Sequence, residues 1–157
     1  MNIPDRKECK SIIARYKTPA NIIEHSEIVC KLAEETADKL ISKGIDVNKN
    51  LVIAAALLHD MLRHKENHVI EGANLIRSLG YPKVAEVMRK HTIYWHENEK
   101  VLPATIEEKI LLCADNNVMG NKIVSLKERI EESEKRNKID LSEEFEICNE
   151  FEKQLVQ

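Results

Sequence analysis

Residues 51–76 read LVIAAALLHDMLRHKENHVIEGANLI, and this stretch decides the fold. Its first eight residues are apolar on every side of a helix, which predicts a helix buried inside the domain. That helix runs directly into the doublet His59-Asp60, and His64 and His68 follow within nine positions. An ionised carboxylate costs several kcal/mol to bury unless it is paired or binds a metal. Either the helix reaches the surface at His59, or its end belongs to a site that binds both groups.

The composition around this stretch favours an all-α fold. The chain has 157 residues, of which 43% are hydrophobic and 32% charged, as in globular domains. Aromatic residues make up only 4%, and there are just 4 glycines and 4 prolines, so a β-sandwich or barrel is disfavoured. We expect a single domain over residues 1–157, with a helical core at about 18–120 and a charged helical C-terminal tail at about 121–157.

Capping residues and apolar periodicity divide the chain into expected helices. The expected ranges are about 18–43, 46–60, 68–79, 83–94, 105–119, 121–136 and 141–155. The segment WHENEKVLP at 95–103 is expected to be a loop, and no segment alternates as a strand would, so we expect no β structure. The last helix carries an apolar stripe that favours packing on its own domain, and both a monomer and a homodimer stay open.

The net charge indicates which partners the protein binds, and the cysteine content indicates the cellular compartment. The formal net charge is −3, with the acidic excess in the tail, so no overall basic field favours nucleic acid or a membrane surface. The 4 cysteines form no CxxC pair, which argues against a zinc ribbon or a disulfide framework. The first ten residues, MNIPDRKECK, contain no apolar stretch of the kind found in a leader, and no apolar run approaches about 18 residues. We therefore expect a cytoplasmic protein without a nucleic-acid or membrane partner.

Polar side chains stand at positions that helical spacing assigns to apolar faces: His25, His59-Asp60, His91 and Asp115. A lone histidine on such a face is more often a satisfied core group than a ligand. Asp115 alone could bond backbone N–H groups at a helix end. Together, imidazoles and carboxylates from four helices would form a mixed nitrogen and oxygen site, in which a divalent metal neutralises the buried negative charge. The pattern therefore predicts a metal site, although spacing does not identify the metal.

In this order, His25, His59-Asp60 and Asp115 resemble the motif of the HD-domain metal-dependent phosphohydrolases. LLHDMLR is similar to that family's LLHDIGK, and HVIEGANLIRSLGYPKVAEVMRKHT is similar to its H-x-x-x-G-A helix followed by a helix ending in His. LPATIEEKILLCADNNV is similar to the segment that carries the family's last Asp. The resemblance covers about residues 18–130.

The resemblance implies a helical HD-domain bundle that binds one or two divalent ions, of Mn, Fe, Ni, Co, Zn or Mg. Residues that match the family's ligands for the first ion are His25, His59, Asp60 and Asp115. A second ion would be held by His68 and His91, with Asp60 as the bridge. His68 can equally be a solvent-facing residue at a helix start.

The chain departs from the family pattern directly after the doublet. Leu62 and Arg63 stand where HDIGK has Gly and Lys, which indicates a different backbone path. The guanidinium of Arg63 keeps the positive charge and can bind phosphate oxygens in pairs. Arg63 can equally be an ordinary surface residue.

The activity implied is hydrolysis of a phosphoester or phosphoanhydride by a metal-activated water. Asp60 and Arg63 are the expected catalytic residues, and the expected substrate is a nucleotide or another small phosphorylated metabolite. One alternative is a dinucleoside polyphosphate hydrolase, whose segments resemble His91-Thr92 and the stretch from Glu108 to Asp115. The other alternative is a non-catalytic helical module that binds a metal or a ligand.

Overall fold

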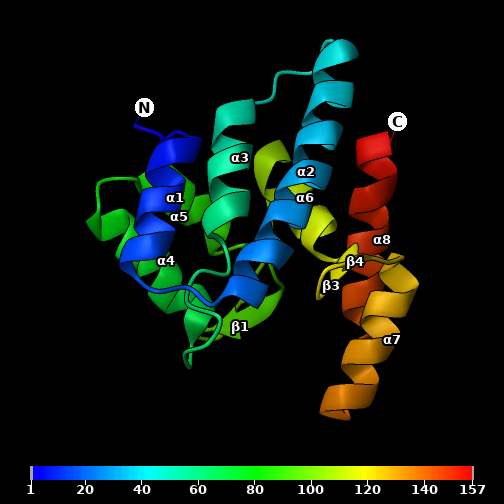
Figure 1. Cartoon of the computed structure of the whole chain (residues 1–157). Helices are drawn as coiled ribbons and strands as arrows, with labels where there is room; N and C mark the ends of the chain where they lie inside the picture. Colours follow the sequence, from blue (N-terminus) through cyan, green and yellow to red (C-terminus); the bar gives the residue numbers. More distant parts are fainter. Residues whose placement is uncertain (1, 157) are drawn as a thin grey trace.

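The structure is a computed structural model that describes residues 2–156. Within this range the chain is mostly helical, with eight helices and two short hairpins (Figure 1). The helices are α1 (Arg6–Arg15), α2 (Ala20–Ser42), α3 (Lys49–Leu58), α4 (His68–Ser78), α5 (Pro82–Met88), α6 (Ile106–Asp115), α7 (Leu126–Asn137) and α8 (Ser142–Val156). The strands are β1 (Tyr94–His96), β2 (Glu99–Val101), β3 (Val118–Met119) and β4 (Lys122–Ile123). The all-α bundle expected from the composition is confirmed.

Helix α3 is the central element of the core. It packs against α1, α2, α5 and α6, and every residue from Leu51 to Leu58 except Ile53 is buried. Each large aliphatic side chain buried there contributes about 1.5 to 3 kcal/mol relative to exposure. The helix ends without reaching solvent, because His59 and Asp60 are 1% and 2% exposed. Of the two alternatives posed by the sequence, a buried site at the helix end is the one observed.

An N-terminal helix lies outside the ranges expected from the sequence. Asp5 caps α1 by accepting a hydrogen bond from the backbone N–H of Glu8. Cys9, Ile12 and Ile13 are buried on the face of α1 toward α3. The sequence RKECKSIIAR contains only four apolar residues, these three and Ala14, which are too few for a periodic pattern.

The expectation of no β structure is wrong at two places. Tyr94–His96 pairs antiparallel with Glu99–Val101 around Glu97 and Asn98, whose φ angles of 50° and 66° form a tight hairpin turn. Each strand has only three residues, which is too short for alternation to be recognised in the sequence. The second hairpin pairs β3 with β4 across Gly120, and α7 consequently begins at Leu126 and not near 121.

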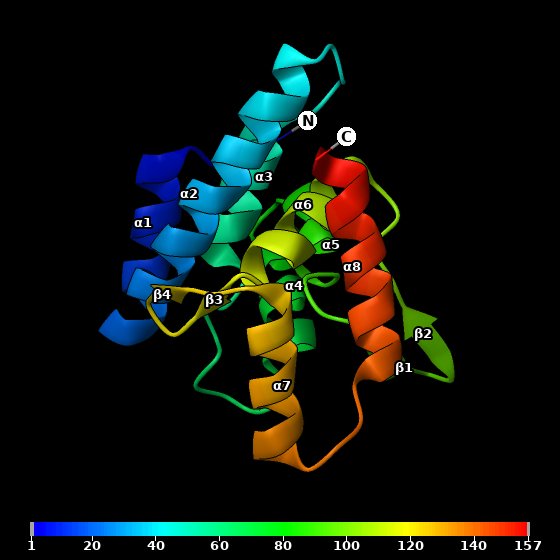
Figure 2. The same ribbon diagram turned by 90° about the vertical axis from the view of Figure 1, so that its right-hand side faces the viewer.

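The C-terminal helices pack on the rest of the chain through one apolar stripe. Helix α8 contacts both α6 and α7, and its residues Cys148 and Leu155 are buried (Figure 2). An ion pair between Lys100 and Glu143 joins the first hairpin to the start of α8. Helix α7 is thereby held near the ends of α3 and α6, where the polar residues of the core meet. None of the helices in the described range is long and apolar enough to cross a membrane.

Candidate metal centre

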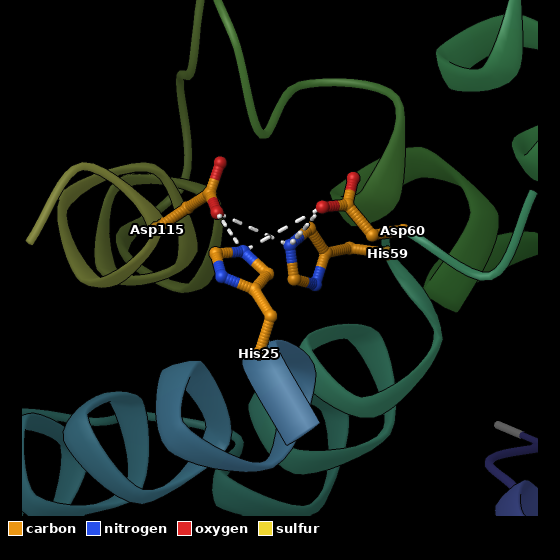
Figure 3. A group of neighbouring side chains, drawn as sticks. All are labelled: His25, His59, Asp60 and Asp115. Atoms are coloured by element: carbon orange, nitrogen blue, oxygen red, sulfur yellow. Dashed lines mark hydrogen bonds and ion pairs between the residues drawn. The ribbon is translucent and has the colours of Figure 1, made fainter. Parts of the chain in front are cut away.

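The polar residues of the core meet because helices end at the same place. His59 directly follows α3, Asp115 is the last residue of α6, and His91 lies just after α5. His68 is the first residue of α4, and His25 lies in the second turn of α2. Figure 3 shows His25, His59, Asp60 and Asp115 pointing toward one another from three sides. Helix carbonyl ends carry partial negative charge, so three of them at one point favour a cation.

The first group of donor atoms surrounds two carboxylate oxygens. His25 Nε2 lies 3.0 Å from Asp115 Oδ1 and 3.6 Å from Asp60 Oδ2 (Figure 3). His59 Nε2 lies 3.3 Å from the same Asp115 oxygen and 3.5 Å from the same Asp60 oxygen. One ligand atom from each of these four residues therefore lies within 4.8 Å of the others, an arrangement that could hold a metal ion.

The second group uses the other oxygen of Asp60. His91 Nε2 lies 3.4 Å and His68 Nε2 lies 3.7 Å from Asp60 Oδ1. This oxygen is buried and makes no hydrogen bond. Asp60, His68 and His91 form a second set of residues that could hold an ion. Asp60 thus faces both sets with one oxygen each, as a bridging carboxylate would.

Backbone carbonyls orient three of the four imidazoles. His59 Nδ1 lies 2.7 Å from Ala56 O and His91 Nδ1 lies 2.6 Å from Met88 O, both carbonyls in the last turn of the preceding helix. His25 Nδ1 lies 2.8 Å from Gly120 O in the β3–β4 turn. A carbonyl oxygen only accepts, so Nδ1 carries the hydrogen and Nε2 faces the carboxylates. A metal-ligating histidine is oriented in the same way.

The electrostatics of the cluster also favour a positive charge at its centre. Burial alone would lower the pKa of His59, but Asp60 and Asp115 outweigh burial and raise this pKa to about 9. Burial would raise the pKa of both carboxyls, yet the nearby His59 holds the pKa of Asp60 and of Asp115 well below the usual value. Both carboxylates therefore stay ionised although they are buried. Burial lowers the pKa of His68 to about 4, against the attraction of Asp60, so its lone pair is free at neutral pH.

The residues present fit a divalent metal. Two ionised carboxylates, four Nε2 atoms that face them, and an Asp60 oxygen without a hydrogen bond form a mixed nitrogen and oxygen donor set. Such a set suits Mn, Fe, Co, Ni and Zn better than it suits Ca, which prefers oxygen ligands alone. The donor set does not choose among the transition metals.

All six residues expected as ligands meet in this cluster, whereas the two remaining histidines do not. His64 and His96 are exposed. Arg63 lies at the edge of the cluster, with Nη1 at 3.6 Å from Asp60 Oδ2 and 42% of its side chain exposed. The roles of these residues as ligands and catalytic groups stay predictions.

The structure also brings two residues to the centre that the sequence did not single out. Arg129 and Arg136 of α7 line cavities beside the cluster together with Arg63. In the sequence they belong to a strongly charged helix, where arginines normally face solvent. Their position depends on how α7 packs, so no local signal identifies them.

The HD domain family model matches residues 22–119. The chain is 34% identical over 149 residues to a tRNA (cytidine(56)-2'-O)-methyltransferase of Picrophilus torridus, covering 86% of this chain and 42% of the relative. It is 29% identical over 163 residues to the enzyme of the same name from Thermoplasma volcanium, covering 95% of this chain and 47% of the relative. An uncharacterised protein of Methanocaldococcus jannaschii is 35% identical over 130 residues, with coverage of 74% and 77%. No solved structure matches significantly.

These relatives correct two expectations. The two relatives with a named activity are tRNA methyltransferases, so the expected metal-dependent phosphohydrolase is wrong as the enzyme class. The same names involve RNA, so the expectation of a small phosphorylated substrate and no nucleic acid is wrong as well. The chain spans less than half the length of either methyltransferase.

Proposed function

Because the chain belongs to the HD-domain family, we propose that it is a metal-binding module of a tRNA-modifying system, which binds tRNA beside its His/Asp cluster. The likeness to two tRNA 2'-O-methyltransferases over most of this chain carries the proposal. The part of the chain that the HD domain family model matches, residues 22–119, includes every residue of the cluster. A module retained in such proteins is expected to act on the same RNA.

The cluster supports this proposal through its charge. A divalent ion held by His25, His59, Asp60 and Asp115 would add positive charge at the floor of the adjoining cavities and attract phosphate oxygens. The affinity of proteins for nucleic acids rests mainly on such contacts with the phosphate backbone. A chain with a formal net charge of −3 can then bind RNA at one locally positive site.

Methyl transfer is not assigned to these residues. Imidazole and carboxylate groups are ligands for a cation. Through the bound cation they would bind RNA, while a separate enzyme of the system carries the methyl donor. His59 and Asp115 would hold the ion, while the carbonyl of Ala56 keeps the imidazole of His59 in place.

The test is binding of a fluorescently labelled tRNA transcript to the Mn²⁺-loaded protein. We expect Asp60→Asn to weaken binding more than about tenfold, because the bridging carboxylate is lost. Asp46→Asn is the matched control, since Asp46 is exposed in the segment between α2 and α3. An unstructured RNA of equal length should bind more weakly than tRNA. Equal binding by both variants, or no preference for tRNA, would refute the proposal.

A further inference from the structure

Two cavities flank the metal centre, and three arginines separate them. The first, of about 220 Å³, is lined by His68, His91 and Asp115, and the second, of about 280 Å³, is lined by His25 and Asp60. The residues that line both cavities are Arg63, Arg129 and Arg136. The three arginines therefore lie where the two cavities adjoin.

The two arginines of α7 are placed there by helix geometry. Arg129 and Arg136 are seven positions apart, which is close to two helical turns and puts both side chains on one face. Arg63 reaches the same place from the segment after α3, and its Nη1 lies 3.6 Å from Asp60 Oδ2. Helix α7 lies outside residues 22–119, so its two arginines are not part of the matched family core.

Arg129 has unused hydrogen-bonding capacity although little of it is exposed. Its side chain is 15% exposed, and its Nε is buried without a hydrogen-bond partner. Its Nη1 donates to Ser133 Oγ at 3.1 Å and lies 3.7 Å from Glu132 Oε2. A guanidinium offers five donors, and a buried donor without a partner costs about 1 to 3 kcal/mol. An anion in the cavity would supply the missing acceptor.

The acidic residues nearby do not neutralise the three arginines. Glu132 lies 3.5 Å from Arg136 Nη1, so it is shared between two guanidinium groups. Glu144 also lines the first cavity. Arg136 is 51% exposed and can turn toward either cavity. The positive charges of the three arginines therefore exceed the negative charges of Glu132 and Glu144 by one. A divalent ion would offset the two carboxylates of the metal centre itself.

We propose that Arg63, Arg129 and Arg136 form a phosphate-binding site beside the metal centre, which takes a backbone phosphate of RNA. Paired N–H donors of guanidinium groups match the oxygens of phosphate in spacing and plane. The phosphate chemistry follows from the arginines themselves. The source of the phosphate in RNA rests on the function proposed above.

The experiment compares Arg129→Gln/Arg136→Gln with a control of equal charge change, Lys7→Gln/Arg15→Gln on the exposed face of α1. Binding of inorganic phosphate to the Mg²⁺-loaded proteins is measured by calorimetry, and tRNA binding is measured as a function of NaCl concentration. We expect the arginine variant to bind phosphate at least about tenfold more weakly. Its slope of log affinity against log salt should fall by about 1.4 to 1.8, at about 0.7 to 0.9 for each of the two lost contacts. The control should keep both values.

Metal affinity serves as the folding control, because the arginine variant, which loses two nearby positive charges, should bind Mg²⁺ at least as tightly as the wild type does. If the double variant does not fold, Arg136→Gln alone, at a half-exposed position, should lower the salt slope by about 1. Unchanged phosphate affinity and salt slope in a folded variant would overturn the site and leave tRNA binding standing. Arginine-dependent phosphate binding by a wild type that binds no tRNA would overturn the proposed function and keep the site.

Discussion

Asp60 and Glu108 are both buried carboxylates, yet their surroundings differ completely. Glu108 is 3% exposed and belongs to the capping box that begins α6. It accepts hydrogen bonds from the backbone N–H groups of Ala104 and Thr105 at 2.7 and 3.1 Å, and from Lys90 Nζ at 3.3 Å. Each of its oxygens is satisfied by the protein itself.

Asp60 is 2% exposed, and its Oδ1 makes no hydrogen bond. Its neighbours are imidazole nitrogens at 3.4 to 3.7 Å and the guanidinium of Arg63 at 3.6 Å. A buried polar atom without a hydrogen-bond partner indicates a role in binding or catalysis. Glu108 therefore has the surroundings of a carboxylate that stabilises the fold, whereas Asp60 has those of a carboxylate that binds a ligand.

The largest effect is expected from Asp60→Asn on metal affinity. Asparagine keeps the shape and removes the negative charge shared by both sets of donor atoms. We expect affinity for Mn²⁺ to fall more than about 100-fold, beyond the loss typical of outer partners of a metal site. Competition with a metal-sensitive dye measures it. Glu108→Gln, measured in parallel, should bind Mn²⁺ as the wild type does. A similar loss of Mn²⁺ affinity in Glu108→Gln would contradict the assignment of Asp60 alone to the metal site.

The second effect is on stability, and here the substitution of Glu108 is expected to matter whether or not metal is bound. Glu108→Ala removes the acceptor of three hydrogen bonds, while Lys90 keeps its ion pair with Glu86 at 3.3 Å. We expect a loss of about 2 to 3 kcal/mol in the free energy of unfolding, because two backbone N–H groups lose their acceptor and hydrogen bonds to a charged group contribute about 1.5 to 3 kcal/mol. Urea denaturation should give the same loss with and without metal. A loss confined to the metal-loaded protein would contradict the structural role.

Metal ions should stabilise the wild type by an amount set by mass action. At a free Mn²⁺ concentration 100 times the Kd, the gain is about 2.7 kcal/mol, or about 5 to 10 °C in Tm for a chain of this size. Thermal unfolding followed by circular dichroism, before and after chelation, measures this gain. Asp60→Asn should show almost none of it. If no divalent transition metal changes the Tm of the wild type, the cluster is a hydrogen-bonded part of the core and not a metal site.

The smallest effect is expected from His25→Ala, which removes one donor of the first set and keeps the second set intact. The Tm of the metal-loaded variant should fall by about 3 to 5 °C more than that of the chelated variant, corresponding to about tenfold weaker binding. His64→Ala is the matched control, because His64 is exposed. Equal losses with and without metal would make His25 a packing residue only.

Much of the cluster could be predicted from the sequence because its signals are local. The apolar run before His59 indicates burial without any knowledge of neighbouring helices. The capping box at Thr105 and Glu108 predicted the start of α6, which in turn sets the face on which Asp115 lies. The two hairpins could not be predicted, because strands of two or three residues are too short to show an alternating pattern of apolar and polar residues.

The second of these hairpins affects the cluster directly. The carbonyl of Gly120 accepts from His25 Nδ1, and the glycine adopts a φ of +62° in that turn. A contact between positions 25 and 120 depends on how α2 crosses the end of α6, which no short-range pattern encodes. The partner that orients His25 could therefore be known only from the tertiary structure.

The sequence by itself determined that a buried helix ends in His59-Asp60 and that His25, His91 and Asp115 lie on apolar faces. Helical periodicity and capping act over one or two turns, so they can be read along the chain. Only the tertiary structure decided that Arg129 and Arg136 face the cluster and that Asp60 Oδ1 has no hydrogen-bond partner. Periodicity tells which face of a helix is buried, whereas the packing of α7 and α8 decides what that face meets.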